Sequence, residues 1–231
     1  MPPSDFRLRV RYGKAGRLRF LSHLEIVRAM ERGIRRAQLP YAVTQGFNRR
    51  IKAGFGPALP VGTASQAEYL DVWLTRYTPA REALEQLRQA LPEGLEPTAA
   101  AYVPEKVGAL TAGESVADYV VGIATEGVEP EGLQAAVDSL VATGTLSVEH
   151  KGKTKVFDLT RALLNEPRVR VAEDGETELA LGIRISQEGS LRPDVFATAA
   201  FANAGIPSHV ASVTRTGFSL LDKEGRAARP I

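Results

Sequence analysis

The stretch DFRLRVRY, residues 5–12, alternates apolar and basic side chains without a break. Successive side chains of an extended chain point to opposite sides, so one face of this stretch is apolar and the other is basic. The apolar face consists of Phe6, Leu8, Val10 and Tyr12, and the basic face of Arg7, Arg9 and Arg11. This two-residue period predicts a strand that buries its apolar face and leaves its arginines in water.

A helix is predicted after the turn at residues 13–16. Ser22 and Glu25 have the spacing of a capping box, which satisfies free amides at a helix start. Apolar residues then recur at steps of three and four, at Val27, Met30, Ile34 and Ala37. Between them lie Arg28, Arg32, Arg35 and Arg36. The helix is therefore predicted to pack on one face and to be basic on the other.

The rest of the first half continues the same alternation of elements. We predict short strands at 41–44 and 95–103, a longer strand at 68–77, and a helix that begins at Thr78-Pro79. The order strand, helix, strand, strand, helix, strand is the split arrangement of a ferredoxin-like domain. The first half is therefore predicted to form one such domain.

The second half repeats this order with additional strand material. Its predicted strands are 116–124, a hairpin-like pair at 146–149 and 155–159, 179–185 and 209–218, with helices at 130–142 and 193–204. Residues 168–172 form an extra strand. We predict an α+β fold of two tandem ferredoxin-like (βαββαβ) domains with antiparallel sheets. A basic N-terminal domain covers 1–104 and a C-terminal domain 114–231, joined by a segment rich in Gly, Ala and Pro.

The composition excludes several classes of site. The chain of 231 residues has no cysteine, and its three histidines are far apart, so neither a metal site nor a cofactor of its own is predicted. No apolar run approaches 18 residues and no signal peptide precedes the first strand, which predicts a cytoplasmic protein without a membrane partner. No serine triad, P-loop or dinucleotide motif is present, and no catalytic residue is predicted.

Charge is unevenly distributed along the chain. Residues 1–60 carry 13 Lys and Arg against 3 Asp and Glu, whereas the remaining residues carry 16 against 24. Concentrated positive charge favours a polyanion such as RNA, although arginines also serve merely to solvate a surface.

The segment VTQGFNRRIKAGFGPALPVG, residues 43–62, is the strongest candidate for a binding site. Its glycines permit close approach of a ligand, and Phe47 and Phe55 are suited either to stack on bases or to anchor the segment inward. Phe55, which Pro57 and Leu59 follow closely, is favoured as the anchor. Arg49, Arg50 and Lys52 are suited to hold phosphates. A second anion site is predicted where Arg17, Arg19 and His23 meet the free amides of the first helix.

Residues 7–75 resemble the bacterial radical-SAM-linked proteins, a family of unknown function. The resemblance is carried by RFLSHLE, the arginine-rich helix, TQGFN, PALPVG and EYLD, in that order. It implies partnership with a radical S-adenosylmethionine protein that would hold the iron–sulfur cluster. The matching positions are Arg19, Ser22, His23, Gln45, Gly46, Phe47, Asn48 and Lys52. Arg49, Arg50 and Ile51 stand where the family has Pro-His-Pro, so no role of a family histidine is carried over to position 50.

Three hypotheses of function follow. The first is an accessory protein, not an enzyme, that binds RNA or another anion and presents a substrate to a radical-SAM partner. The second is an RNA-processing endoribonuclease of the tandem ferredoxin-like type, with His23 as the base. The third is a small-anion binding module in which the segment 43–62 closes over the ligand.

Overall fold

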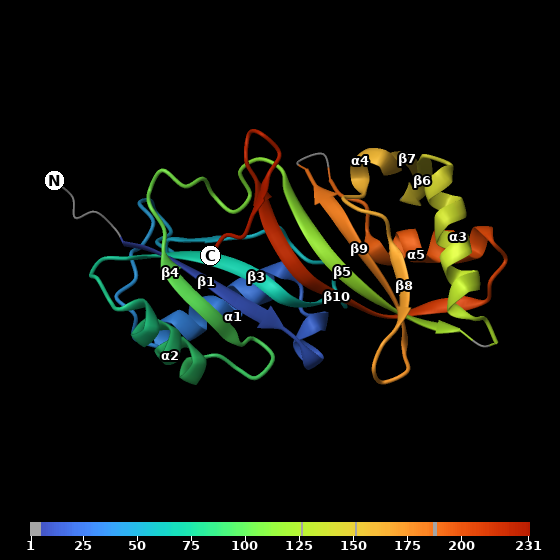
Figure 1. Ribbon diagram of the computed structural model, residues 1–231. Coiled ribbons are helices and arrows are strands. Elements are labelled where there is room, and N and C mark those ends of the chain that lie inside the picture. Colours follow the sequence, from blue (N-terminus) through green and yellow to red (C-terminus); the bar gives the residue numbers. More distant parts are fainter. Residues whose placement is uncertain (1–5, 126, 151, 187–188) are drawn as a thin grey trace. The chain divides into compact units, whose positions relative to one another are not determined.

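The computed structural model describes residues 6–125, 127–150, 152–186 and 189–231, and it divides into two compact units. Unit 1 comprises the described residues up to Ala112 together with Arg229–Ile231, and unit 2 comprises the described residues of Gly113–Ala228. Each unit is α+β, with antiparallel strand pairs and few helices (Figure 1).

Unit 1 follows the predicted order of elements. These are β1 (Phe6–Lys14), α1 (His23–Arg36), β2 (Ala53–Phe55), β3 (Ala64–Leu74), α2 (Ala80–Ala90) and β4 (Pro97–Tyr102). A short 3-10 helix, η1 (Gly16–Phe20), connects β1 to α1. The strands lie in the order β4-β1-β3-β2, and each neighbouring pair is antiparallel.

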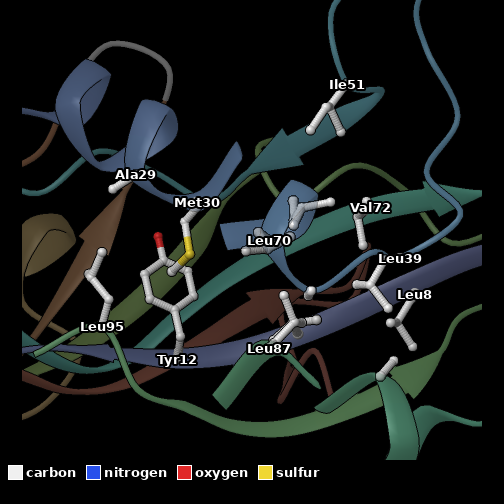
Figure 2. Packing of buried hydrophobic residues seen from close by; sticks show 14 of the residues in the cluster. Leu8, Tyr12, Ala29, Met30, Leu39, Ile51, Leu70, Val72, Leu87 and Leu95 are labelled. Atoms are coloured by element: carbon white, nitrogen blue, oxygen red, sulfur yellow. The ribbon is translucent and has the colours of Figure 1, made fainter. Parts of the chain in front are cut away.

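The core of unit 1 lies between this sheet and its two helices. The register places Leu8 opposite Val72 and Val10 opposite Leu70, so the apolar faces of β1 and β3 coincide. The helices contribute Ile26, Ala29, Met30 and Ile34 from α1, and Ala83 and Leu87 from α2. Figure 2 shows buried side chains of this core, among them Leu39 and Ile51 from the segment between α1 and β2.

The prediction that the arginines of β1 face water is wrong for Arg7 and Arg9, which are 7% and 0% exposed. Both donate to Asp71 of β3, from Arg7 Nη2 at 2.6 Å and from Arg9 Nε at 2.7 Å. Burial of a charge is tolerated when a hydrogen-bonded counter-charge accompanies it. Arg7 Nη2 also donates to the carbonyl oxygen of Gly108 at 2.9 Å, which ties the segment after β4 to unit 1.

The second strand of unit 1 lies later in the chain than predicted. Residues Tyr41 and Val43 form only isolated bridges, with Leu74 and Ile51 respectively, whereas Ala53–Phe55 pairs with β3. The chain folds back on itself between Val43 and Ile51, which prevents this part from extending as a strand of the sheet. The long connection therefore precedes β2 and does not follow it.

Unit 2 has a sheet of order β10-β5-β9-β8. Its elements are β5 (Ser115–Thr125), α3 (Pro130–Ala142), β6 (Thr145–His150), β7 (Lys153–Asp158), α4 (Leu159–Ala162), β8 (Arg168–Val171), β9 (Thr177–Ile185), α5 (Pro193–Asn203), β10 (Ser208–Leu221) and β11 (Ala227–Ala228). The strand pairs are antiparallel, and β11 pairs with β10.

In unit 2, the predicted hairpin and the predicted extra strand differ from the structure in which of them joins the main sheet. The strand treated as extra, β8, pairs with β9 in the main sheet, whereas β6 and β7 form a separate hairpin. The residues of β7 are exposed except for the half-buried Phe157. A strand without a buried face does not serve as a layer of a core, so the hairpin stands outside the sheet as an insertion.

Candidate functional site

The loop 44–50 is closed at its base by a short ladder. Val43 and Ile51 form an antiparallel bridge, and Thr44 N donates to the carbonyl oxygen of Arg50 at 2.8 Å. Arg50 N in turn donates to Thr44 Oγ1 at 3.1 Å. Gly46 has a φ of 141°, a backbone conformation that side chains disfavour. These hydrogen bonds give the loop a defined turn that begins and ends beside the edge of the sheet.

Phe47 extends from this loop into solvent, with a relative exposure of 104%. Its neighbours Gln45, Gly46, Asn48, Arg49 and Arg50 are exposed as well. Of the two roles left open for the phenylalanines, the inward anchor belongs to Phe55. That ring is half-buried, packs against the core of unit 1, and lies 6.0 Å from the ring of His23 in an edge-on arrangement.

The start of α1 carries the predicted capping box. Ser22 N and Ser22 Oγ both donate to Glu25 Oε2, at 2.8 and 2.7 Å. These hydrogen bonds lower the pKa of Glu25 below its ordinary value. The carboxylate of Glu25 therefore already lies at the start of α1. An anion bound at the predicted site would be repelled by this negative charge.

The basic residues near α1 do not surround His23. The Arg19 guanidinium lies 4.8 Å from the ring centroid of the exposed Phe20, and Arg17 is exposed. Within the described part of the chain, His23 has its ring contact with Phe55 but no hydrogen bond or ion pair. The geometry therefore offers no acid–base partner for the nuclease mechanism.

Lys52 lies on the opposite face of the sheet from the helices. Its Nζ is 5.3 Å from the ring centroid of Trp73, which the Arg7 guanidinium also approaches to 5.3 Å. Ile51, the residue before Lys52, is buried in the core. The alternation of an extended chain thus separates Lys52 from its neighbours in sequence.

The predicted site residues consequently occupy three places. Arg17, Arg19, Ser22 and His23 lie in η1 and at the start of α1, Gln45, Gly46, Phe47, Asn48, Arg49 and Arg50 lie in the loop 44–50, and Lys52 lies beside Trp73.

Arg19 and the loop 44–50 lie toward opposite ends of β3. Gly62 N donates to Arg19 O just before this strand begins, whereas Ala42 N donates to Trp73 O near its end. At about 3.3 Å per residue, the two ends of β3 are roughly 30 Å apart. His23 lies between them, beside Phe55, which pairs with Leu70 in the middle of the strand. The basic residues of η1 and those of the loop therefore do not form one site.

A group of exposed apolar side chains, not predicted from the sequence, lies near the start of α1. Phe20, Leu24 and Val61 are 56%, 66% and 60% exposed. The sequence pattern gave no signal for Leu24, because it lies three residues before Val27 and so continues the predicted apolar stripe, whereas the helix buries Ile26 and Met30. Large exposed apolar side chains often mark interaction surfaces when they cluster.

Neither a metal centre nor a membrane-spanning helix is found among the residues that the structure describes. No group of three or more His, Cys, Asp or Glu side chains there is arranged to hold a metal ion. None of the helices in this part of the chain combines the length and the apolar character needed to cross a membrane.

The chain resembles one half of larger solved proteins. In the structure entitled "Crystal Structure of a Cbf5-Nop10-Gar1 Complex", one chain matches with 14% identity and a TM-score of 0.51, over 93% of this chain and 49% of that one. A chain of the archaeal box H/ACA sRNP Nop10-Cbf5 complex matches with 14% identity and a TM-score of 0.43, over 90% and 46%. The protein thus spans about half the length of these chains, and the first likeness shows the fold alone.

Comparison with curated proteins gives no match. A family model described as "Uncharacterized protein conserved in bacteria (DUF2344)" matches residues 7–193. This match covers unit 1 from Arg7 to Ala112 and unit 2 as far as the first residue of α5. The chain therefore belongs to this conserved bacterial family.

Proposed function

We propose that the protein is an accessory RNA-binding protein that presents an RNA substrate to a radical S-adenosylmethionine enzyme, and that loop 44–50 contacts the RNA. The observation that carries this proposal is the exposure of Phe47, at 104%, on a loop closed by hydrogen bonds. An aromatic ring exposed to water contributes little to its own fold. On binding, stacking of a base on such a ring is worth about 1–3 kcal/mol.

Positive charge supports the same assignment. Arg49 and Arg50 are exposed and follow Phe47 closely in the loop, where their guanidinium groups are suited to phosphates on either side of a stacked base. The helix α1 adds four exposed arginines, Arg28, Arg32, Arg35 and Arg36. Such a field accelerates the approach of a polyanion even without direct contact.

The partner enzyme is proposed from the sequence resemblance at residues 7–75. The chain has no cysteine, so a cluster held by cysteines belongs to the partner. We assign its docking surface to the apolar residues Phe20, Leu24 and Val61. Substitution of all three by serine is predicted to abolish co-purification with the partner while RNA binding persists.

We also propose that the two units are similar domains. The sheet of unit 1 has the strand order β4-β1-β3-β2, and that of unit 2 the order β10-β5-β9-β8. If the sheet strands of each unit are numbered along the chain, both orders read fourth, first, third, second. This agreement supports tandem ferredoxin-like domains, with the hairpin β6–β7 inserted in the second.

The test is a titration of single-stranded RNA oligonucleotides by fluorescence anisotropy. The double variant R49A/R50A is expected to bind more weakly and to lower the slope of log affinity against log salt by about 0.7 for each phosphate that is no longer neutralised. The control R168A/R170A removes two exposed arginines from the region of β8 and is expected to bind as the wild type does. Absence of RNA binding by the wild-type protein, or equal weakening in both double variants, would overturn the proposal.

The same samples distinguish the ribonuclease alternative. The accessory role predicts intact RNA after prolonged incubation, with or without divalent metal. Cleavage by the wild-type protein that disappears in H23A would replace the accessory role with a histidine-dependent nuclease.

A further inference from the structure

Unit 2 contains a recess of about 810 Å³ that the function proposed above does not use. Small-molecule sites have volumes of about 300–1,000 Å³, so a ligand the size of a nucleotide fits. The recess is bounded by β7, α4 and the end of β9. Its charged and aromatic lining residues are Glu114, Lys155, Phe157, Asp158, Arg161 and Arg184.

The walls of the recess are fixed to each other at several points. Leu163, directly after α4, forms an antiparallel bridge with Ile183 of β9, and Leu159 is only 1% exposed. Arg184 Nε donates to the carbonyl oxygen of Arg161 at 3.3 Å. The inserted hairpin and the sheet of unit 2 therefore form a recess that exists before any ligand arrives.

The acidic side chains of the recess are occupied by local partners. Asp158 Oδ1 accepts from both the amide and the hydroxyl of Thr160, at 2.9 and 2.6 Å, and these bonds lower the pKa of Asp158. Glu114 Oε2 accepts from Arg184 Nη1 at 3.2 Å. Arg184 thus uses two of its five N–H donors in these bonds, which leaves others for a ligand.

Basic groups outnumber acidic ones in the described lining, with three against two. Lys155 reaches from β7 toward the opposite wall, because its Nζ lies 3.1 Å from the position that a Cβ would take at Gly189. The same Nζ is 4.9 Å from the ring centroid of Phe157. Three cationic groups from β7, α4 and β9 therefore line one recess.

We propose that this recess binds a small phosphate-bearing anion through Lys155, Arg161 and Arg184. A phosphate presents several oxygens at once, which suits two planar guanidinium groups and an ammonium better than a single carboxylate does. The two carboxylates of the lining pair with the two arginines, since Asp158 Oδ2 lies 3.7 Å from Arg161 Nε and Glu114 Oε2 accepts from Arg184 Nη1. This site is independent of loop 44–50, so it stands whether or not the protein binds RNA.

The test is isothermal titration of the full-length protein with pyrophosphate, against sodium chloride of equal ionic strength. Saturable binding is expected for the wild type. Affinity should fall about tenfold in K155M and in R184Q, because each variant lacks one charge-assisted hydrogen bond to the ligand. The control R170Q removes an exposed arginine whose partner is Glu178 and is expected to bind normally. Titration with adenosine monophosphate and inorganic phosphate then shows whether the ligand is a nucleotide or a free phosphate.

Two outcomes would overturn this proposal. One is the absence of saturable binding of all three phosphate compounds by the wild type. The other is a K155M protein that binds pyrophosphate with the affinity of the wild type. K155M is informative even if R184Q fails to fold, because Lys155 is exposed and its replacement leaves the bridge between Leu163 and Ile183 intact. Both K155M and R184Q are expected to bind RNA normally, which separates this site from the function proposed above.

Discussion

Among individual residues, a buried aspartate of β3 and two arginines of β1 form hydrogen-bonded ion pairs between these two strands of unit 1. Asp71 is 1% exposed and receives hydrogen bonds from both Arg7 and Arg9. Alternation in the sequence correctly places these arginines on the face away from the core. It could not show that this face is also buried, because only the structure places Asp71 between the two guanidinium groups.

Replacement of Asp71 by asparagine is predicted to destabilise the protein by about 3–5 kcal/mol, because two buried guanidinium groups lose their counter-charge. Urea denaturation followed by circular dichroism measures this change. The control D138N alters an exposed aspartate of α3 and is expected to change stability by about 0.5 kcal/mol or less. A D71N protein as stable as D138N would show that the buried pairs contribute nothing.

Among the elements, the segment 43–62 divides into an exposed loop and an anchored strand. Phe47 is fully exposed, whereas Phe55 in β2 packs against the core and His23. The sequence favoured Phe55 as the anchor because Pro57 and Leu59 follow it closely. The sequence pattern could not predict where β2 begins, nor that Lys52 lies apart from Arg49. Both depend on where the chain turns back, between Thr44 and Arg50.

Phe55→Ala is predicted to lower the free energy of unfolding by about 2 kcal/mol, less than the roughly 3–5 kcal/mol expected for a fully buried ring. Phe47→Ala is predicted to leave thermal stability unchanged, because its ring is exposed to water. Melting curves of the two variants measured side by side check both statements. Equal destabilisation of the two would contradict the assignment of anchor and exposed ring.

The capping box of α1 gives a pH-dependent contribution to stability. The pKa of Glu25 is lowered in the folded protein, chiefly by hydrogen bonds from Ser22, so its carboxylate stabilises the fold above pH 4.5. This contribution is lost as the pH falls from 4.5 through the lower folded-state pKa. The stability difference between wild type and E25Q should therefore shrink in that range, whereas E131Q in the first turn of α3 serves as control. A difference independent of pH would show that the carboxylate is not the stabilising group.

For the molecule as a whole, the alternating patterns predicted an α+β chain with antiparallel sheets, and the structure confirms this coarse description. The patterns misjudged which strands of the second half join the sheet. In the structure β8 has four residues, whereas β6 and β7 have six each, and yet only β8 joins the main sheet. Pairing of β8 with β9 depends on the short turn from Ala172 to Glu176, whose importance local patterns do not reveal.

The proposed role of the whole molecule depends on Phe47 stacking on an RNA base. Because Trp73 is the only tryptophan of the chain, the double variant W73F/F47W carries a single indole at the tip of the loop. Its fluorescence should be quenched when single-stranded RNA binds, and polyphosphate, which has charge but no bases, should leave the emission unchanged. RNA binding without any change in this emission would contradict stacking at position 47.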